Sequence, residues 1–301
     1  MSTRTLALIG ATLVSVIYGV TFTIAKDVMP TYIEAYGFIL VRVGCCVVLF
    51  WIAGLFAPKE RIQNSDFPRI ILAAMFGVAI NMLTFFKGLS YTSPISASVI
   101  MVTTPIIVLV LSAIMIRESM QFKKVIGIVL GLAGTIFLIA YGKAETNAPN
   151  ATLGNLLVFI NAVSFGLYLI LVKKLMDKYN AFSFVKWIYF FGFLMVLPFG
   201  WNEFNDVQWN TIPVGIYWKI GFVILFSTFI TYLLNLLSMK TLRPVTVAVF
   251  IYLQPLFASI FAIGLGKDEL TWVKILAALL IFVGVYLVTH KQAVEANAQP
   301  K

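Results

Sequence analysis

Four side-chain amides interrupt otherwise apolar stretches of this 301-residue sequence: Asn81, Asn161, Asn235 and Gln254. An amide that faces hydrocarbon has no hydrogen-bonding partner, so these side chains should point toward protein or water. Because an amide both donates and accepts hydrogen bonds, it suits the binding of a polar solute. Hydrogen bonding between helices is the alternative, at about 1 kcal/mol or less for each contact. For the four amides together, we favour a hydrophilic cavity.

Hydroxyl-bearing side chains accompany these amides at helical spacing. Thr228, Thr231, Tyr232 and Asn235 follow an i, i+3, i+4, i+7 pattern, which places all four on one face of a helix. For any single Ser or Thr, however, a hydrogen bond between helices is the interpretation that we favour. The candidate substrate-binding residues are Tyr18, Asn81, Thr84, Thr104, Asn161, Tyr168, Thr231, Tyr232, Asn235 and Gln254.

Two prolines lie near the middle of apolar stretches, and each follows a polar residue. Pro105 follows Thr104, and Pro255 follows Gln254. A proline inside a helix removes one backbone hydrogen bond and loosens the carbonyl four residues earlier. Within a membrane, freed backbone is tolerated only against protein or a water-filled cavity. The prolines therefore predict two bent helices that line the cavity, with kinked packing alone as the alternative.

Charged residues are scarce within the apolar stretches. Arg42 is the one charge clearly inside a stretch, and Lys87 lies at the end of another. Either side chain could pair with an anionic group of a substrate, bond to a neighbouring helix or extend to the membrane interface. We favour structural roles for Arg42, and we assign structural or gating roles to Arg42, Lys87, Pro105 and Pro255.

Groups that perform covalent or proton chemistry are absent from the middle of these stretches. All 12 acidic residues fall in loops or at the ends of stretches, and His290 ends the last one. The sequence contains no metal-ligand cluster, phosphate-binding loop or Ser-His-Asp set, so it predicts no metal, no cofactor and no enzyme. Facilitated diffusion or exchange is the expected mode of transport, and proton coupling through Glu34 is the weaker alternative.

The composition indicates a protein surrounded by lipid. Hydrophobic residues make up 61% of the chain and charged residues 11%, whereas soluble domains have about 45–50% and 25%. A helix needs about 20 apolar residues to cross a bilayer. Backbone groups in lipid must pair internally, so spans of this kind are helices. The expected spans are 6–25, 36–57, 70–89, 95–116, 124–141, 153–172, 184–201, 215–238, 245–265 and 271–289.

The sequence contains an internal duplication. Residues 92–134 align with a second segment at a shift of 150 positions, which matches Pro105 to Pro255 and Gly134 to Gly284. Five spans in each half is an odd number, so the halves insert with opposite orientations. The sequence thus predicts an all-α integral membrane protein whose ten transmembrane helices form two inverted five-helix repeats, at 1–143 and 152–291, and a short cytoplasmic tail at 292–301. Such inverted repeats are typical of secondary transporters, with the binding site near the midplane.

The distribution of charged residues predicts how the chain is oriented in the membrane. The net charge is +10, but the basic residues are dispersed among loops, which argues against a nucleic-acid partner. Lys and Arg are more frequent on the side of the N-terminus, which predicts cytoplasmic termini in an inner (plasma) membrane.

Gly127, Gly131 and Gly134 include a GxxxG spacing that permits close helix approach. We expect them to meet the tenth span around Gly284 within a monomer.

Several of these features together resemble the EamA family of the drug/metabolite transporter superfamily. They are Arg42 in the second span, the Leu89-Ser90-Tyr91-Thr92-Ser93-Pro94 entry to the fourth, the mid-span prolines, Arg117-Glu118 and the Gly-rich fifth span. The resemblance covers nearly the whole chain up to about Lys291. It implies the ten-helix fold and the export of amino acids, other small metabolites or toxic compounds. The second half departs from the pattern, because its second span has no Arg that corresponds to Arg42.

The expected function is transport of small metabolites such as amino acids, by an exporter or facilitator that works by alternating access around a midplane cavity. Its partners are then a small-molecule substrate and the lipid bilayer. One alternative is a membrane-embedded binding or regulatory protein that transports nothing. The other is a sugar or nucleotide-sugar carrier, whose substrates would favour more than one inward Arg or Lys.

Overall fold

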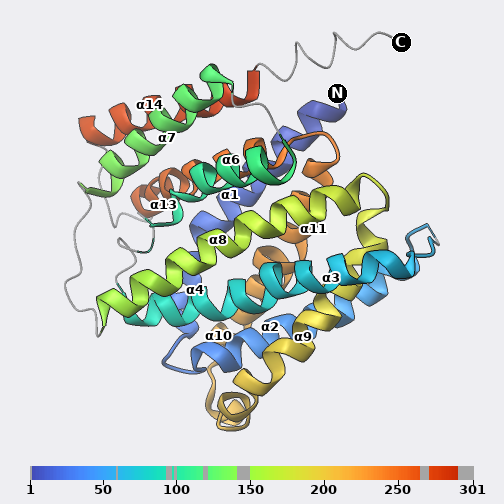
Figure 1. Cartoon of the computed structure of the whole chain (residues 1–301). Coiled ribbons are helices and arrows are strands. Elements are labelled where there is room, and N and C mark those ends of the chain that lie inside the picture. Colours follow the sequence, from blue (N-terminus) through green and yellow to red (C-terminus); the bar gives the residue numbers. More distant parts are fainter. Residues whose placement is uncertain are drawn as a thin grey trace.

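The computed structural model describes residues 2–58, 60–92, 97, 100–117, 121–140, 150–264 and 271–290. All regular elements within these residues are helical (Figure 1). Among the described residues, eight helical stretches are long and apolar enough to cross a membrane. The all-helical membrane class is confirmed. The start of the fourth expected span and the tail at 292–301 lie outside the described residues.

The helices of the first half follow the expected spans closely. They are α1 (Thr3–Val28), α2 (Ala35–Leu55), the short turn η1 (Asn64–Asp66), α3 (Phe67–Ala74), η2 (Met75–Ala79), α4 (Ile80–Tyr91), α6 (Thr104–Met115) and α7 (Phe122–Ala140). The helices of the second half are α8 (Ala151–Met176), α9 (Ala181–Asn205), η3 (Trp209–Thr211), α10 (Val214–Phe222), η4 (Val223–Ile230), α11 (Thr231–Met239), α12 (Pro244–Val249), η5 (Phe250–Tyr252), α13 (Leu253–Gly264) and α14 (Trp272–His290).

Two of the long stretches change their winding in the middle. The α3–η2–α4 stretch passes through the π-helical segment Met75–Ala79, and the α10–η4–α11 stretch passes through Val223–Ile230. A π-helical turn shifts the backbone hydrogen bonds from i→i−4 to i→i−5, and it occurs frequently at functional sites. The sequence predicts uninterrupted α-helices here, so the π-helical segments are a difference between the prediction and the structure. Neither contains a proline that would have indicated it.

The mid-span prolines lie where helices restart. After a turn at Val102 and Thr103, α6 begins at Thr104 and carries Pro105 in its first turn. Likewise, α13 begins directly after the 3-10 segment η5 and carries Pro255 in its first turn. In a first turn the backbone N–H has no helical partner, so a proline costs little there. The expected bends are thus breaks between two helical segments.

Two tight helix pairs lie at opposite edges of the bundle. In Figure 1, α7 and α14 lie side by side at one edge, and α2 and α9 lie side by side at the other. At the first edge, a Cβ atom added to Gly284 would lie 2.6 Å from the carbonyl oxygen of Gly127 and 2.6 Å from the nitrogen of Gly131. The expected glycine contact between these two spans is confirmed.

Carboxylates tie α2 and α9 together at both ends. Glu203, near the end of α9, accepts hydrogen bonds from the backbone N–H groups of Tyr36 and Gly37 at 2.6 and 2.8 Å. Glu60, after the end of α2, accepts from the backbone N–H of Asn180 at 2.7 Å, and from the Ser183 hydroxyl at 3.0 Å. A carboxylate at a helix N-terminus satisfies free N–H groups and complements the helix dipole. Glu203 of α9 therefore caps the start of α2, and Glu60 in the segment after α2 caps the start of α9.

The space between the two edges is filled by helices that cross from one half to the other. Here α1 packs against α11 and α13, while α8 packs against α4 and α6. Large apolar side chains face outward from the bundle, among them Ile114, Trp218 and Leu279. An extended apolar exterior of this kind requires lipid rather than water.

The close contact between α7 and α14 gives a direct test of the fold. We expect Gly284→Ala to lower the stability of the protein by about 1–3 kcal/mol, because the added methyl group forces two backbones apart. Gly221→Ala is the matched control, since a Cβ atom at Gly221 meets nothing within 4 Å. It should leave stability unchanged or slightly raised. Thermal unfolding of both variants in detergent measures the difference, and equal midpoints would contradict this packing.

Candidate functional site

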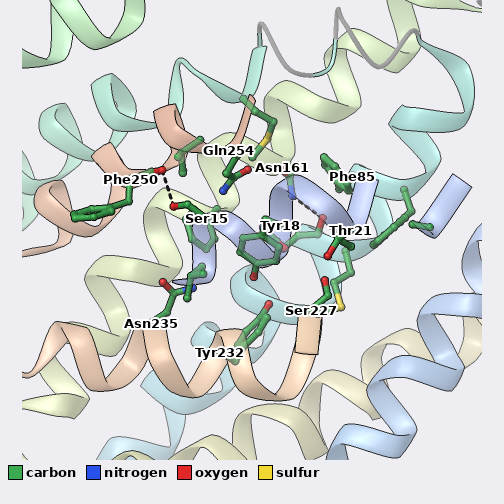
Figure 2. Close-up of a pocket in the computed structure, with 18 of the residues that line it drawn as sticks. Ser15, Tyr18, Thr21, Phe85, Asn161, Ser227, Tyr232, Asn235, Phe250 and Gln254 are labelled. Carbon is green, nitrogen blue, oxygen red and sulfur yellow. Dashed lines mark hydrogen bonds between the residues drawn. The ribbon is translucent and has the colours of Figure 1, made fainter. Parts of the chain in front are cut away.

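A cavity of about 120 Å³ lies among α1, α2, α4, α8, α11 and the broken stretch α12–η5–α13 (Figure 2). One water molecule needs roughly 10–15 Å³ of such space, so the cavity has room for a small solute. Its walls come from both halves of the chain. The polar lining is Ser15, Tyr18, Thr21, Arg42, Asn81, Asn161, Ser227, Tyr232, Asn235 and Gln254. The apolar lining is Ala11, Val14, Ala25, Met82, Phe85, Phe86, Leu89, Met101, Phe165, Val247, Phe250 and Ile251.

One face of α1 forms a continuous wall of the cavity. Ser15, Tyr18 and Thr21 line it at three-residue spacing, and Tyr18 lies between Gln254 and Tyr232 in Figure 2. A Cβ atom at Gly19 would lie only 2.9 Å from the carbonyl oxygen of Gln254, so glycine lets α1 approach this backbone closely. That approach brings the broken stretch α12–η5–α13 to the cavity.

Backbone carbonyls in the irregular segments are bonded by side chains of neighbouring helices. The Ser15 hydroxyl donates to the carbonyl of Phe250 in η5 at 2.8 Å. In η2, the Ser164 hydroxyl donates to the carbonyl of Phe76 at 2.6 Å, and the Tyr232 hydroxyl donates to the carbonyl of Gly77. These bonds satisfy backbone groups that a buried irregular segment would otherwise leave unpaired.

Asn161 connects α8 to α4 across the cavity wall. Its Nδ2 donates to the backbone carbonyl of Asn81 at 2.8 Å, as the dashed line in Figure 2 shows. The Oδ1 of Asn161 is buried and has no hydrogen-bond partner. The Oγ of Ser227, also in the lining, is likewise buried and unpartnered. Two residues of the lining therefore carry buried polar atoms that have no protein partner.

Arg42 is the charged residue of the described lining. Its side chain is buried, with 4% of the residue exposed, and both Nε and Nη2 donate to Oγ1 of Thr228, at 3.1 and 3.0 Å. The guanidinium carbon lies 4.7 Å from the ring centre of Phe86 and 5.7 Å from that of Phe38. Rings at these distances attract a cation. The Arg42 side chain is therefore held within the helical bundle.

The structure brings six of the ten candidate binding residues to the cavity. These are Tyr18, Asn81, Asn161, Tyr232, Asn235 and Gln254, and Arg42 from the structural or gating set joins them. All four amides are in this group. They come from four different helical stretches, which are α4, α8, α11 and α13.

The other candidates lie outside the lining of this cavity. Thr84 and Thr231 donate to carbonyls of their own helical stretches, those of Ile80 and Ser227, each at 2.7 Å. Tyr168 is buried, and its ring lies where a Gly77 side chain would be. The remaining residues outside the lining are Thr104, Lys87, Pro105 and Pro255.

Thr104 and Lys87 have clear local environments. Thr104 begins α6 and is fully buried beside Pro105, and its Oγ1 has no hydrogen-bond partner. The Lys87 ammonium lies 5.2 Å from each of the ring centres of Tyr36 and Tyr91. Lys87 thus joins the end of α4 to the start of α2 by cation–π contacts.

Sequence reasoning missed several polar lining residues. Ser15 and Thr21 flank Tyr18 at three-residue spacing, so a search for a polar stripe on the first span would have found them. Ser227 was not recoverable in this way, because the π-helical segment alters the spacing around it. Among the described residues, no group of three His, Cys, Asp or Glu side chains could hold a metal ion. The described lining contains no carboxylate or imidazole.

Comparisons with known proteins identify the family. The model of the EamA-like transporter family matches residues 5–140 and again residues 152–290. The uncharacterized transporter YyaM of Bacillus subtilis is 25% identical over 276 residues, which are 90% of this chain and 89% of that protein. A WAT1-related protein of Arabidopsis thaliana is 24% identical over 310 residues, which are 93% of this chain and 82% of that protein.

A solved structure supports the fold alone. A crystal structure of a protein with 17% sequence identity matches with a TM-score of 0.77, over 98% of this chain and 99% of that chain. The two matches to the family model together span nearly all of the sequence. This multi-pass membrane protein therefore belongs to the EamA-like transporter family.

Proposed function

We propose that this protein is a secondary transporter that moves small organic metabolites, such as amino acids, by alternating access around the cavity. The observation that carries the proposal is a cavity enclosed by helices of both halves within a membrane-spanning bundle, with ten polar side chains in its largely apolar wall. Four amides at that depth would be costly without a polar ligand or water. In this proposal the protein is a monomer that exports or equilibrates its substrate and catalyses no reaction.

The proposal includes two inverted repeats of five helices. Contacts exchanged between the halves support it: α1 packs on α11 and α13, and α8 packs on α4 and α6. A Cβ atom at Gly19 would meet the nitrogen of Ala258 at 3.1 Å, and one at Gly166 would meet Val108 at 3.3 Å. Val108 and Ala258 are 150 positions apart, the same shift as the sequence duplication. Two matches to one family model add to this support.

With cytoplasmic termini in a plasma membrane, the cavity would lie in the outer half of the bilayer. Its lining extends along α1 from Ala11 to Ala25, which is near the end of the helix away from the N-terminus. Closer to the N-terminus, the Ser238 hydroxyl donates to the carbonyl of Ala7 at 2.9 Å and joins α11 to α1. Alternating access would then require that this inner contact between the two halves opens.

The lining favours a small amphipathic solute. Aromatic and aliphatic side chains, among them Phe85, Phe165 and Phe250, form much of the wall around the polar groups. A cavity of about 120 Å³ suits an amino acid better than a nucleotide sugar. The single cation in the described lining also argues against nucleotide sugars, whose diphosphate would need more positive charge.

A substitution in the lining tests the transport site. We expect Gln254→Leu to slow solute exchange at least about tenfold, because a site built to hydrogen-bond its ligand loses a polar partner. Thr84→Val is the matched control, since Thr84 lies outside the lining and bonds to its own helix. Counterflow in proteoliposomes with a panel of amino acids and other metabolites measures both variants.

Two results would contradict this assignment. Equal exchange rates in the Gln254 and Thr84 variants would place the substrate elsewhere. A wild-type protein that exchanges no member of the panel would instead favour a membrane-embedded binding or regulatory protein.

Proton coupling has its own test. Because the described lining has no carboxylate or imidazole, we expect an imposed pH gradient not to drive uphill uptake. Glu34, the weaker candidate for coupling, is exposed at the N-cap of α2 and makes no side-chain cap hydrogen bond. Glu34→Gln should therefore leave exchange unchanged. Uphill uptake in wild-type vesicles that disappears in Glu34→Gln would show that Glu34 carries the proton.

A further inference from the structure

Resting on the proposed transport function, we propose that Arg42 is a carboxylate-binding subsite and that the substrates carry a single carboxylate attached to a largely apolar body. The subsite comprises the guanidinium of Arg42 together with the hydroxyl of Ser227, which lines the same cavity and directly precedes Thr228, the hydrogen-bond partner of Arg42. The proposal reverses the structural role that sequence reasoning favours for Arg42.

The guanidinium has more donors than the protein satisfies. Arginine carries five N–H donors. The two hydrogen bonds to Thr228 come from Nε and Nη2, and Nη1 is buried without a hydrogen-bond partner. A buried donor that lacks a partner is costly, and the cost is larger when the group is charged. The unpaired Nη1 of a residue in the cavity wall therefore marks a place where an acceptor binds.

Thr228 does not neutralise the positive charge of Arg42. Its hydroxyl donates to the carbonyl of Val223 at 2.9 Å, so it meets Arg42 with its lone pairs only. This bond spans five residues, which is the spacing of the π-helical segment η4. The π-helical winding thus orients Thr228 as a neutral acceptor that fixes the Nε and Nη2 side of the guanidinium. The positive charge remains without a carboxylate among the described lining residues.

The surroundings of Arg42 select a monoanion over a dianion. One arginine can balance one negative charge, and the second charge of a phosphate would stay buried and unpaired. A guanidinium matches the two oxygens of a carboxylate geometrically. Phe86 lies against the guanidinium, and Met82, Phe85 and Leu89 continue the apolar wall from there. This arrangement accommodates a carboxylate with an aliphatic or aromatic body attached.

An amino acid supplies the same carboxylate as a simple organic acid, and the two differ only in the ammonium group. Within the described lining that ammonium has no anionic partner, but the unpartnered Oδ1 of Asn161 could accept a hydrogen bond from it. The carboxylate is the group that both sources share. The experiment separates them.

The test measures binding to the purified full-length protein with matched probes. Isovalerate, isovaleramide and isoamylamine share one branched body and differ in charge, and leucine and leucinamide extend the comparison to a zwitterion. Affinity is determined by isothermal titration calorimetry. We expect isovalerate or leucine, or both, to bind at least about tenfold more tightly than the corresponding amide, and isoamylamine not to bind.

Variants then assign the preference to Arg42. Arg42→Met should remove the difference between acid and amide. Arg42→Lys should weaken acid binding while keeping the preference, because lysine retains the charge but lacks the planar fork. Lys87→Met is the control, since it removes a cation that lies outside the lining, and it should leave the preference intact. Ser227→Ala, which removes an unpartnered hydroxyl, should weaken acid binding even if Arg42→Met fails to fold.

The proposal is overturned if the amides bind as tightly as the acids, if none of the acids binds, or if Arg42→Met keeps the preference. Counterflow separates this result from the transport function. Exchange without a carboxylate preference would refute the subsite but remain consistent with the proposed transport function. A carboxylate preference without exchange would support the subsite and refute transport.

Discussion

The need to pair every backbone polar group inside a lipid-surrounded bundle shapes this molecule. Where helices break or change their winding, carbonyls lose their helical partners, and side chains from neighbouring helices replace them. Ser15 bonds to Phe250 in this way, and Tyr232 bonds to Gly77. These bonds join α1 to η5 and α11 to η2, so the irregular segments are held in place beside the cavity. The polar side chains of the cavity wall and the irregular backbone segments are thus connected by the same requirement, that buried backbone carbonyls be hydrogen-bonded.

Much of the fold follows from composition and periodicity. The spans, the breaks at Pro105 and Pro255, and the glycine contact around Gly284 all depend on local properties: apolar length, a missing N–H and a missing side chain. The four amides were equally recoverable, because an amide in an apolar stretch has few acceptable environments. Each of them lines the cavity.

The candidates outside the cavity lining have positions that local sequence properties do not determine. A helical threonine can bond to a carbonyl of its own helix, as Thr84 and Thr231 do, and the sequence does not distinguish this from a cavity position. The position of Tyr168 depends on Gly77, a residue far away in the sequence. Thr228, which bonds to Arg42, lies in a π-helical segment, and no sequence motif predicts that segment. These features arise only when separate helices meet.

The mutual capping of α2 and α9 limits how the molecule can move. Glu203 accepts hydrogen bonds from amides in the first turn of α2, and Glu60 accepts one from the amide of Asn180, the N-cap residue of α9. Sliding either helix along the other by one turn would strip both carboxylates from their amides at once. The two helices are thus linked by hydrogen bonds at both ends of the pair. A rearrangement that separated α2 from α9 would have to break the bonds at both ends.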